Sequence, residues 1–322
     1  MQRAIFLLPA WSVFGRQRLS PELAKAFGRA DAVQGGGAGR TAQLSRHFAV
    51  LPKQWAPAAL TRQVDAGDAA GAAWLRADPA HVRPDINGAR LLGIGARLSL
   101  SQQDVDALLP ALKPVFGDAG FALDAPTPAR WYLRLAREAR LPRFSDPDEA
   151  LGEDLFEHQP DGPEGRRWRV LLSDVQIVLH NHPWNATRSE RGLVAINALW
   201  VWGGGLLPDR VTSTVSQACS EDDLLRALMR VAGGEAQILP ADLACARIDG
   251  DTLFDLRQGR DLAALQRDWL RPAADAVRSG ALDSLTLDAA DGNTLRLTKT
   301  QRWRFWRGAW SPPAAASSES EA

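Results

Sequence analysis

Residues 165–208 read GRRWRVLLSDVQIVLHNHPWNATRSERGLVAINALWVWGGGLLP. In the first part, up to residue 181, apolar side chains recur every three or four positions, which predicts a helix with one buried face. Pro183 ends that helix, because proline cannot donate a backbone hydrogen bond. The nearly unbroken apolar run at 195–202 is typical of a strand covered on both faces, and 203–205 predicts a glycine turn after it.

Shorter elements of the same two kinds lie on both sides of this stretch. Ser20 and Pro21 form a helix start, with a capping hydroxyl followed by proline at the first helical position. Ser220 begins a second capping pattern, and Asp291-Gly292 predicts the turn of a hairpin. We expect strands at 5–8, 48–51, 131–135, 284–288 and 294–299, and helices at 66–75, 101–112, 224–231 and 262–277. Helices alternating with short apolar strands predict a layered α/β fold with a mixed sheet.

Bulk composition predicts a soluble protein. The chain has 322 residues and 45% apolar content, enough for one large domain or two ordinary ones. Lys plus Arg and Asp plus Glu both total 38, so net charge favours neither nucleic acid nor an anionic membrane. Cys219 and Cys245 lack CxxC spacing, which indicates reduced thiols and a cytoplasmic location. No apolar run reaches the roughly 18 residues of a membrane span.

The quoted stretch carries a family resemblance. The turn 145–148 (SDPD) precedes the long helix, and His182-Pro183, Asn185, Arg188 or Arg191, and Gly192 follow it. Asn197, the apolar strand and the glycines come next, before Pro208. This order and spacing resemble archaeal-type cofactor-independent phosphoglycerate mutases, in which such a turn precedes a helix ending in His-Pro-x-Asn-x-x-Arg-x-x-Gly.

The chain also resembles a group of bacterial regulatory proteins of the RpfE type, named for regulation of pathogenicity factors. The similar segments are WLRADPAHVRPD at 74–85, EDLFEHQPDG at 153–162 and the run from 179 to 205. This resemblance implies a regulatory role and leaves the molecular activity open.

The mutase resemblance implies a fold whose metal-binding residues are missing from this sequence. That family belongs to the alkaline-phosphatase-like superfamily, whose core binds two divalent metals through Asp and His and whose Ser carries the phosphoryl group. Here the first strand ends LLPAW at 7–11, with no carboxylate until Glu22, and no histidine follows Asn197. We therefore expect no metal site, no cofactor and no catalytic residue.

These implications divide the chain into four parts. Residues 1–72 and 205–310 would form the two halves of a degenerate alkaline-phosphatase-like α/β core. Residues 73–204 would form an inserted α+β subdomain that corresponds to the substrate-facing domain of the mutases. Residues 311–322 (SPPAAASSESEA) are polar and small, which predicts a disordered tail.

One group of candidate ligand-binding residues follows the long helix. An arginine after a proline turn can grip a phosphate or carboxylate with two parallel donors. Simple structural roles compete with this reading, since imidazoles cap helix ends and loop arginines are usually solvated. We expect these residues to gather near one concave surface and to bind an acidic ligand: His182, Asn185, Arg188, Arg191 and Asn197.

A second group of candidates lies in a proline-containing segment. Asp78, His81 and Arg83, with Asp85 beside them, could converge on a ligand, and a His with a nearby Asp is the minimum for general base catalysis. No Ser or Cys nucleophile accompanies them in a recognisable motif. A hydrogen-bonded structural loop is therefore the favoured interpretation, with ligand binding as the alternative.

The segment 299–310, KTQRWRFWRGAW, combines four positive charges with four aromatic rings and has no acidic residue. Alternating cations and rings could neutralise phosphates and stack on unpaired bases of a single-stranded nucleic acid. The same alternation describes a packed edge strand. The sequence favours the packed strand and disfavours nucleic acid.

Together these features predict a non-catalytic regulatory protein that binds a small acidic or phosphorylated metabolite. The alternative is an active phosphoglycerate mutase or phosphatase with atypical metal ligands. A nucleic-acid-associated protein that uses the basic C-terminal segment is the third hypothesis.

Overall fold

The computed structural model describes residues 2–85 and 88–312. They form two compact units, which are treated separately: unit 1 comprises residues 2–49 and 210–312, and unit 2 comprises residues 50–85 and 88–209. The described residues of the expected insertion, 73–204, belong to unit 2, which also takes in 50–72. The expected tail, 311–322, lies almost wholly outside the described residues. Among the described residues, no helix is both long and apolar enough to cross a membrane.

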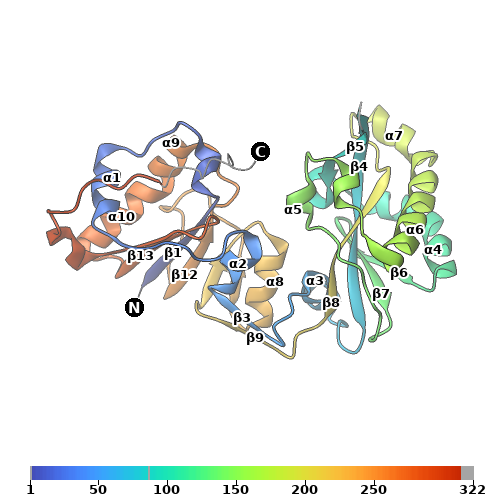
Figure 1. Ribbon diagram of the computed structural model, residues 1–322, viewed down its shortest axis with the longest axis horizontal. Coiled ribbons are helices and arrows are strands. Elements are labelled where there is room, and N and C mark those ends of the chain that lie inside the picture. The colour runs from blue at the N-terminus through green and yellow to red at the C-terminus, as the bar shows by residue number, and fades with distance from the viewer. Residues whose placement is uncertain (1, 86–87, 313–322) are drawn as a thin grey trace, which may run out of the picture. The chain divides into compact units, whose positions relative to one another are not determined.

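Unit 1 is built on a mixed sheet of seven strands, in the order β11-β10-β12-β1-β13-β14-β2 (Figure 1). The central strand β1 pairs in parallel with β12 on one side and β13 on the other. β13 and β14 form the antiparallel hairpin that Asp291-Gly292 predicts. The strands are β1 Arg3–Leu8, β2 Asp31–Val33, β10 Gln217–Cys219, β11 Glu235–Gln237, β12 Asp251–Asp255, β13 Ser284–Ala289 and β14 Thr294–Thr298.

Helices cover both faces of this sheet (Figure 1). Phe6, Phe254 and Leu287 face one helical layer and form the main core of the unit with it. That layer contains η1 Trp11–Phe14, α1 Pro21–Gly28, α9 Leu262–Leu265, the π-helical turn η4 Gln266–Leu270 and α10 Arg271–Ser279. The other layer contains α2 Arg40–Ser45 and α8 Asp223–Val231. β3 Phe48–Leu51 and β9 Arg210–Ser213 form a separate two-stranded sheet, and η5 Lys299–Trp303 follows β14.

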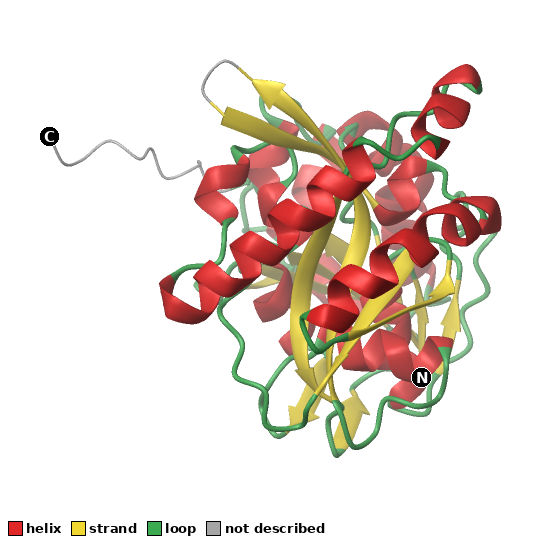
Figure 2. Cartoon of the chain, turned by 90° about the vertical axis from the view of Figure 1, so that its right-hand side faces the viewer, coloured by secondary structure: helices red, strands yellow, loops and turns green. Residues whose placement is uncertain are grey.

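Unit 2 contains a five-stranded sheet around one long strand, β4 Ala73–Asp85, which pairs with β5, β7 and β8. Figure 2 shows two long helices, α4 and α6, lying side by side across one face of this sheet, and the apolar face of each joins its core. The elements are α3 Pro57–Asp65, β5 Gly88–Ile94, η2 Gly95–Leu98, α4 Gln102–Asp118, β6 Ala122–Thr127, β7 Arg130–Leu135, α5 Pro147–Ala150, η3 Leu155–His158, α6 Gly162–His180, α7 Trp184–Glu190 and β8 Ala198–Leu206.

Most expected elements are confirmed, including the mixed α/β layering and the long helix α6. The helix expected at 66–75 is wrong, because helix α3 starts earlier at Pro57 and β4 begins at Ala73. The turn expected at 203–205 is also wrong, since these glycines continue β8. A Cβ on Gly204 would lie 2.7 Å from the Leu75 side chain, and one on Gly205 would lie 2.8 Å from Ala56. Glycine here permits close packing, and it does not reverse the chain.

Candidate functional site

Arg188 occupies a buried position in unit 2. The sequence suggests a loop arginine, but the residue lies in α7 and only 1% of it is exposed. Its Nη1 donates to Asp104 Oδ1 at 2.7 Å, Nη2 donates to the Leu98 carbonyl at 2.8 Å, and Nε donates to the Val194 carbonyl at 2.9 Å. The expectation of an exposed side chain is therefore wrong, because all three guanidinium nitrogens hold neighbouring segments together.

Asp104 is the other half of this buried pair. It lies in the first turn of α4, where it also closes a capping box with Ser101. The Trp184 indole donates to the same carboxylate at 2.8 Å. Burial acts to raise the pKa of Asp104, but the hydrogen bonds from Trp184, Ser101 and Arg188 outweigh it and hold the pKa below its usual range.

Two asparagines from the first candidate group also hold backbone. Asn185 donates to the carbonyls of Leu179 and Ile196 and accepts from the Ile196 N–H at 2.8 Å. Asn197 pairs with both backbone groups of Val82, at 2.8 and 2.7 Å. Val82 lies where the ladder between β4 and β5 changes register, with Leu92 of β5 as the extra residue. On the opposite edge of β4, Asn197 continues the pairing of β8 through its side chain, one residue before β8 begins.

The second candidate group divides between core and surface. Asp78 is 2% exposed and accepts from Arg76 Nε and from the Trp202 indole, both at 2.8 Å. Burial raises the pKa of Asp78, against the opposing charge of Arg76. His81 contacts the Ala195 carbonyl through Nδ1 at 2.8 Å, and Arg83 is exposed near the end of β4.

The remaining candidates are only partly buried or exposed. His182 accepts from the Trp184 N–H through Nδ1 at 3.2 Å, at the end of α6. Arg191 donates to Gln103 Oε1 at 3.0 Å and stacks over the Trp184 ring, with 5.4 Å between the guanidinium carbon and the ring centroid. Asn197 and His81 meet at β4, whereas Arg188, Arg191 and Trp184 meet near the start of α4. Of the eight candidates, Arg83 and Arg191 are exposed, His81, His182, Asn185 and Asn197 are half-buried, and Asp78 and Arg188 are buried.

A different cluster lies at the carboxyl ends of the parallel strands of unit 1, where open α/β sheets ordinarily bind ligands. We call Asp222, Asp255, Asp288 and their partners the carboxyl-edge network. Asp255 ends β12, and Asp222 is the N-cap of α8, accepting from the N–H groups of Leu224 and Leu225. Ser220 joins the two, because its hydroxyl donates to Asp255 at 2.6 Å and accepts from the Asp222 N–H.

Two arginines neutralise this pair of carboxylates. Arg257 donates to Asp255 through Nε and to Asp222 through Nη2, both at 2.7 Å, and Arg40 donates to Asp222 at 2.7 Å. Burial acts to raise the pKa of Asp222, but the charges of Arg40 and Arg257 outweigh it and hold the pKa well below its usual range. Burial likewise opposes the charge on Arg257, yet its two carboxylate partners raise its pKa.

Asp288, in β13, forms the second part of the network and is 1% exposed. Arg46 makes a two-pronged contact with it, with Nη2 at 2.6 Å, and His47 Nε2 lies 2.7 Å from its other oxygen. Gln43 links β1 to β13, because its amide donates to the carbonyls of Leu8 and Asp288. Helix α2 and the residues after it thus clamp the end of the sheet.

The carboxyl-edge network does not fit a two-metal centre. Asp255 and Asp288 are both in register with Leu7 of β1, so a whole strand separates them. Each carboxylate already has a guanidinium within hydrogen-bonding distance. Within 2–85 and 88–312, no three His, Cys, Asp or Glu side chains are grouped so that they could hold a metal ion.

The expectations drawn from the sequence did not include the carboxyl-edge network. Ser220 was expected to cap the helix, but Asp222 is the cap and Ser220 bonds to Asp255. A usable signal was present, because Asp255 and Asp288 each come at or near the end of an apolar strand. Arg257 lies two residues after its partner Asp255, but Arg40 and Arg46 are 182 and 242 residues from Asp222 and Asp288, and no local pattern connects these distant pairs.

Part of the chain is similar in sequence to known proteins. A stretch of 62 residues is 39% identical to a probable 2,3-bisphosphoglycerate-independent phosphoglycerate mutase of Geobacter sulfurreducens, covering 19% of this chain and 16% of that protein. A stretch of 106 residues is 26% identical to the corresponding enzyme of Methanothrix thermoacetophila, covering 31% of this chain and 26% of that protein. The matches therefore span only 16% and 26% of the length of these curated relatives. No family model matches the chain.

Two solved structures align over most of the chain. The cofactor-independent phosphoglycerate mutase from Thermoplasma acidophilum has a TM-score of 0.43 and 16% identity, covering 92% of this chain and 90% of that one. The PH0037 protein from Pyrococcus horikoshii has a TM-score of 0.49 and 12% identity, covering 92% and 87%. The chain is a mixed α/β protein that is related, through part of its sequence, to cofactor-independent phosphoglycerate mutases.

Proposed function

We propose that this protein is a non-catalytic relative of cofactor-independent phosphoglycerate mutases, which acts in regulation by binding a small acidic or phosphorylated ligand. The main support for the absence of catalysis is that the carboxylates of the carboxyl-edge network are already paired with arginines. Asp222, Asp255 and Asp288 each contact at least one arginine, at 2.6–2.7 Å. Carboxylates paired in this way have little remaining capacity to bind a cation.

The physical reason is charge balance. A two-metal mechanism needs anionic ligands that hold divalent ions, which then stabilise the attacking and leaving oxygens. In this chain arginine supplies the positive charge instead, through donors fixed to the protein. Unlike a bound metal ion, an arginine cannot coordinate a water molecule and lower its pKa, and it cannot coordinate the reacting oxygens. The network is therefore suited to structure rather than to phosphoryl transfer.

The ligand half of the proposal rests on the relatives and on the exposed cations of unit 2. The relatives are named for phosphoglycerate, which carries a phosphate and a carboxylate. Of the eight expected binding residues, we retain as ligand-contacting candidates the exposed Arg83 and Arg191 and the half-buried His182 at the end of α6. The other five, Asp78, His81, Arg188, Asn185 and Asn197, would support the surface through the backbone and core contacts described above.

Turnover tests the non-catalytic half. Purified protein is incubated with 3-phosphoglycerate and Mn²⁺, and the conversion to 2-phosphoglycerate is followed by ³¹P NMR. We expect no conversion above the blank. Metal-dependent conversion that is lost in Asp255→Asn and kept in the exposed control Asp249→Asn would establish the alternative, an active mutase with atypical ligands.

Thermal shift with phosphoglycerates tests the ligand half separately. We expect stabilisation of the wild type and a weaker effect in Arg191→Ala, because a charge-assisted contact contributes about 1.5–3 kcal/mol. An equal effect in both proteins, or none in either, would remove these residues from the proposal and leave the non-catalytic half standing.

A further inference from the structure

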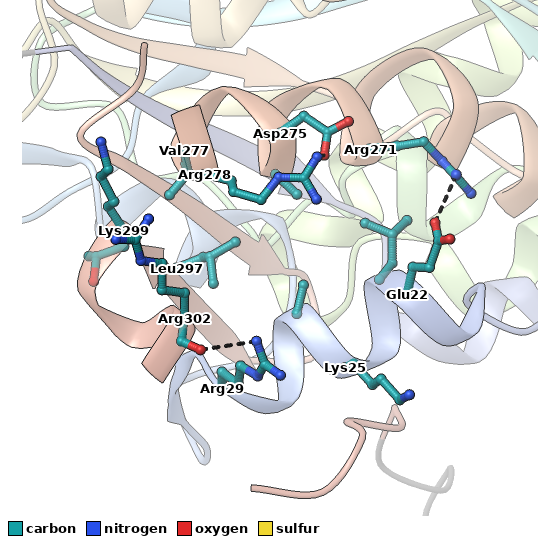
Figure 3. Close-up of a pocket in the computed structure, with 14 residues that line it drawn as sticks. Glu22, Lys25, Arg29, Arg271, Asp275, Val277, Arg278, Leu297, Lys299 and Arg302 are labelled. Carbon is teal, nitrogen blue, oxygen red and sulfur yellow. Dashed lines mark hydrogen bonds and ion pairs between the residues drawn. The ribbon is translucent and has the colours of Figure 1, made fainter. Parts of the chain in front are cut away.

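A basic groove lies on the helical face of unit 1 (Figure 3). It has a volume of about 550 Å³ and runs between α1, α10 and the junction of β14 with η5. Its floor is apolar, since Leu23, Val277 and Leu297 also belong to the core of the unit. Six cations and two carboxylates line it: Lys25, Arg29, Arg271, Arg278, Lys299 and Arg302, with Glu22 and Asp275.

The charges of this groove are unbalanced. Arg271 pairs with Glu22 at 3.0 Å, and Arg278 pairs with Asp275 at 2.9 Å. Arg29 and Lys299 instead donate to backbone carbonyls, those of Arg302 and Ser279. In the part of the chain that the structure describes, neither of them, nor Lys25 or Arg302, has a carboxylate within ion-pair distance. Four uncompensated cations around one cavity repel each other and attract an anion.

Three exposed aromatic rings follow the groove residue Arg302 in the chain. Arg302 lines the groove and lies over the Trp303 ring at 4.9 Å. Trp303, Phe305 and Trp306 are 66%, 78% and 70% exposed, and the last two meet edge to face at 5.5 Å. Three neighbouring rings of this size are costly to leave in water without a partner. The expectation that 299–310 packs as an edge strand is wrong, and of its four aromatic rings only Trp310 packs inward, against Trp11.

Polar contacts hold the segment that carries these rings. A capping box of Thr298 and Gln301 starts η5, so the chain turns into a helix where a strand was expected. Gln301 donates to Asp31 at 2.8 Å, and Arg307 donates to the Ala30 carbonyl at 2.7 Å. The Trp310 N–H donates to the carbonyl of Ala24 in α1 at 2.8 Å. The rings therefore extend from a backbone that is fastened to α1 and the loop after it, beside the groove.

We propose that this surface binds single-stranded nucleic acid. The phosphates of the strand lie along the four uncompensated cations, and unpaired bases stack on Trp303, Phe305 and Trp306. A cationic channel with adjacent rings is the arrangement that binds unpaired strands without base-specific contacts. The proposal goes beyond the proposed function and does not depend on it, since no residue of the carboxyl-edge network lines the groove.

The combination of features selects this ligand over simpler anions. A free phosphate or a small phosphorylated metabolite would use the cations alone, and it would leave the three rings exposed. An anionic membrane would contact cations and rings together. A membrane presents a broad surface, however, whereas these cations line the walls of a groove. Both ligands remain as outcomes of the experiment.

The test is fluorescence anisotropy with a labelled single-stranded oligothymidylate. Each neutralised phosphate contributes about −0.7 to the slope of log affinity against log salt, so four contacts predict a slope of about −3. Lys299→Glu with Arg302→Glu should weaken binding at least tenfold and flatten this slope. The triple change of Trp303, Phe305 and Trp306 to Ala should also weaken binding at least tenfold, with the slope kept. Arg247→Glu is the matched control, because Arg247 is exposed and does not line the groove.

Four results would overturn the proposal. The first is an absence of oligonucleotide binding at low salt. The second is binding that both the groove variant and the ring variant retain. The third is binding to anionic phosphatidylserine vesicles without binding to the oligonucleotide. The fourth is displacement of the oligonucleotide by tripolyphosphate together with unchanged affinity of the ring variant, which would assign the groove to free phosphates. Circular dichroism of each variant guards against loss of fold.

Discussion

Unit 1 contains two arginine-rich regions that differ in the burial and pairing of their positive charges. In the carboxyl-edge network, the guanidinium groups of Arg257 and Arg46 are largely buried and meet carboxylates at 2.6–2.7 Å. In the basic groove, Lys299 and Arg302 are exposed and have no described carboxylate partner. The same residue types therefore hold a fold together in one place and remain available for a ligand in the other.

The difference shows what makes a cation functional. A buried guanidinium is kept by its partners, because an unpaired buried charge is strongly unfavourable. An exposed cation contributes little to stability, so its presence in a cluster of like charges needs another reason. Burial and pairing, more than the presence of arginine, separate structural from binding residues in this chain.

The largest effect should follow from Arg257→Ala. The change leaves Asp222 and Asp255 without their shared partner, and removing one member of a buried pair costs about 3–5 kcal/mol of unfolding free energy. Arg302→Ala, the matched change in the groove, should alter stability by less than about 1 kcal/mol. Urea unfolding of both variants measures the contrast, and similar losses in the two would show that the regions do not differ as described.

A second pair tests the same contrast in unit 2. Arg188→Ala removes three hydrogen bonds and leaves Asp104 buried without its charge partner, so a loss of about 3 kcal/mol is expected. Arg191→Ala, three residues away and exposed, should cost less than about 1 kcal/mol. Thermal unfolding decides, and equal melting temperatures for the two variants would refute the structural role of Arg188.

Local pattern predicted much of the fold correctly. The apolar period gave the position of α6, the capping hydroxyl of Ser20 gave the start of α1, and Asp291-Gly292 gave the hairpin. The errors came where packing decided the outcome. The glycines at 203–205 read as a turn, but β8 uses them to admit α3 and Leu75 at close range, which no local signal reveals.

The candidate site was harder to predict, for a related reason. His182, Asn185 and Arg188 come from a family motif, yet a motif does not tell whether a polar side chain meets a ligand or the backbone. Asn185 and Arg188 bond to carbonyls of segments up to 90 residues away in sequence. Two partners in the carboxyl-edge network are farther apart still, since Arg40 is 182 residues from Asp222 and Arg46 is 242 residues from Asp288. Long-range polar pairing of this kind appears only in three dimensions.

The most direct test of the central claim, that arginines neutralise the carboxylates of the carboxyl-edge network, is Mn²⁺ binding to the wild-type protein by isothermal titration calorimetry. We expect no stoichiometric binding to the wild type, because Asp222, Asp255 and Asp288 already have charged partners. Stoichiometric binding of about two Mn²⁺ ions per chain, abolished by Asp255→Asn, would contradict it.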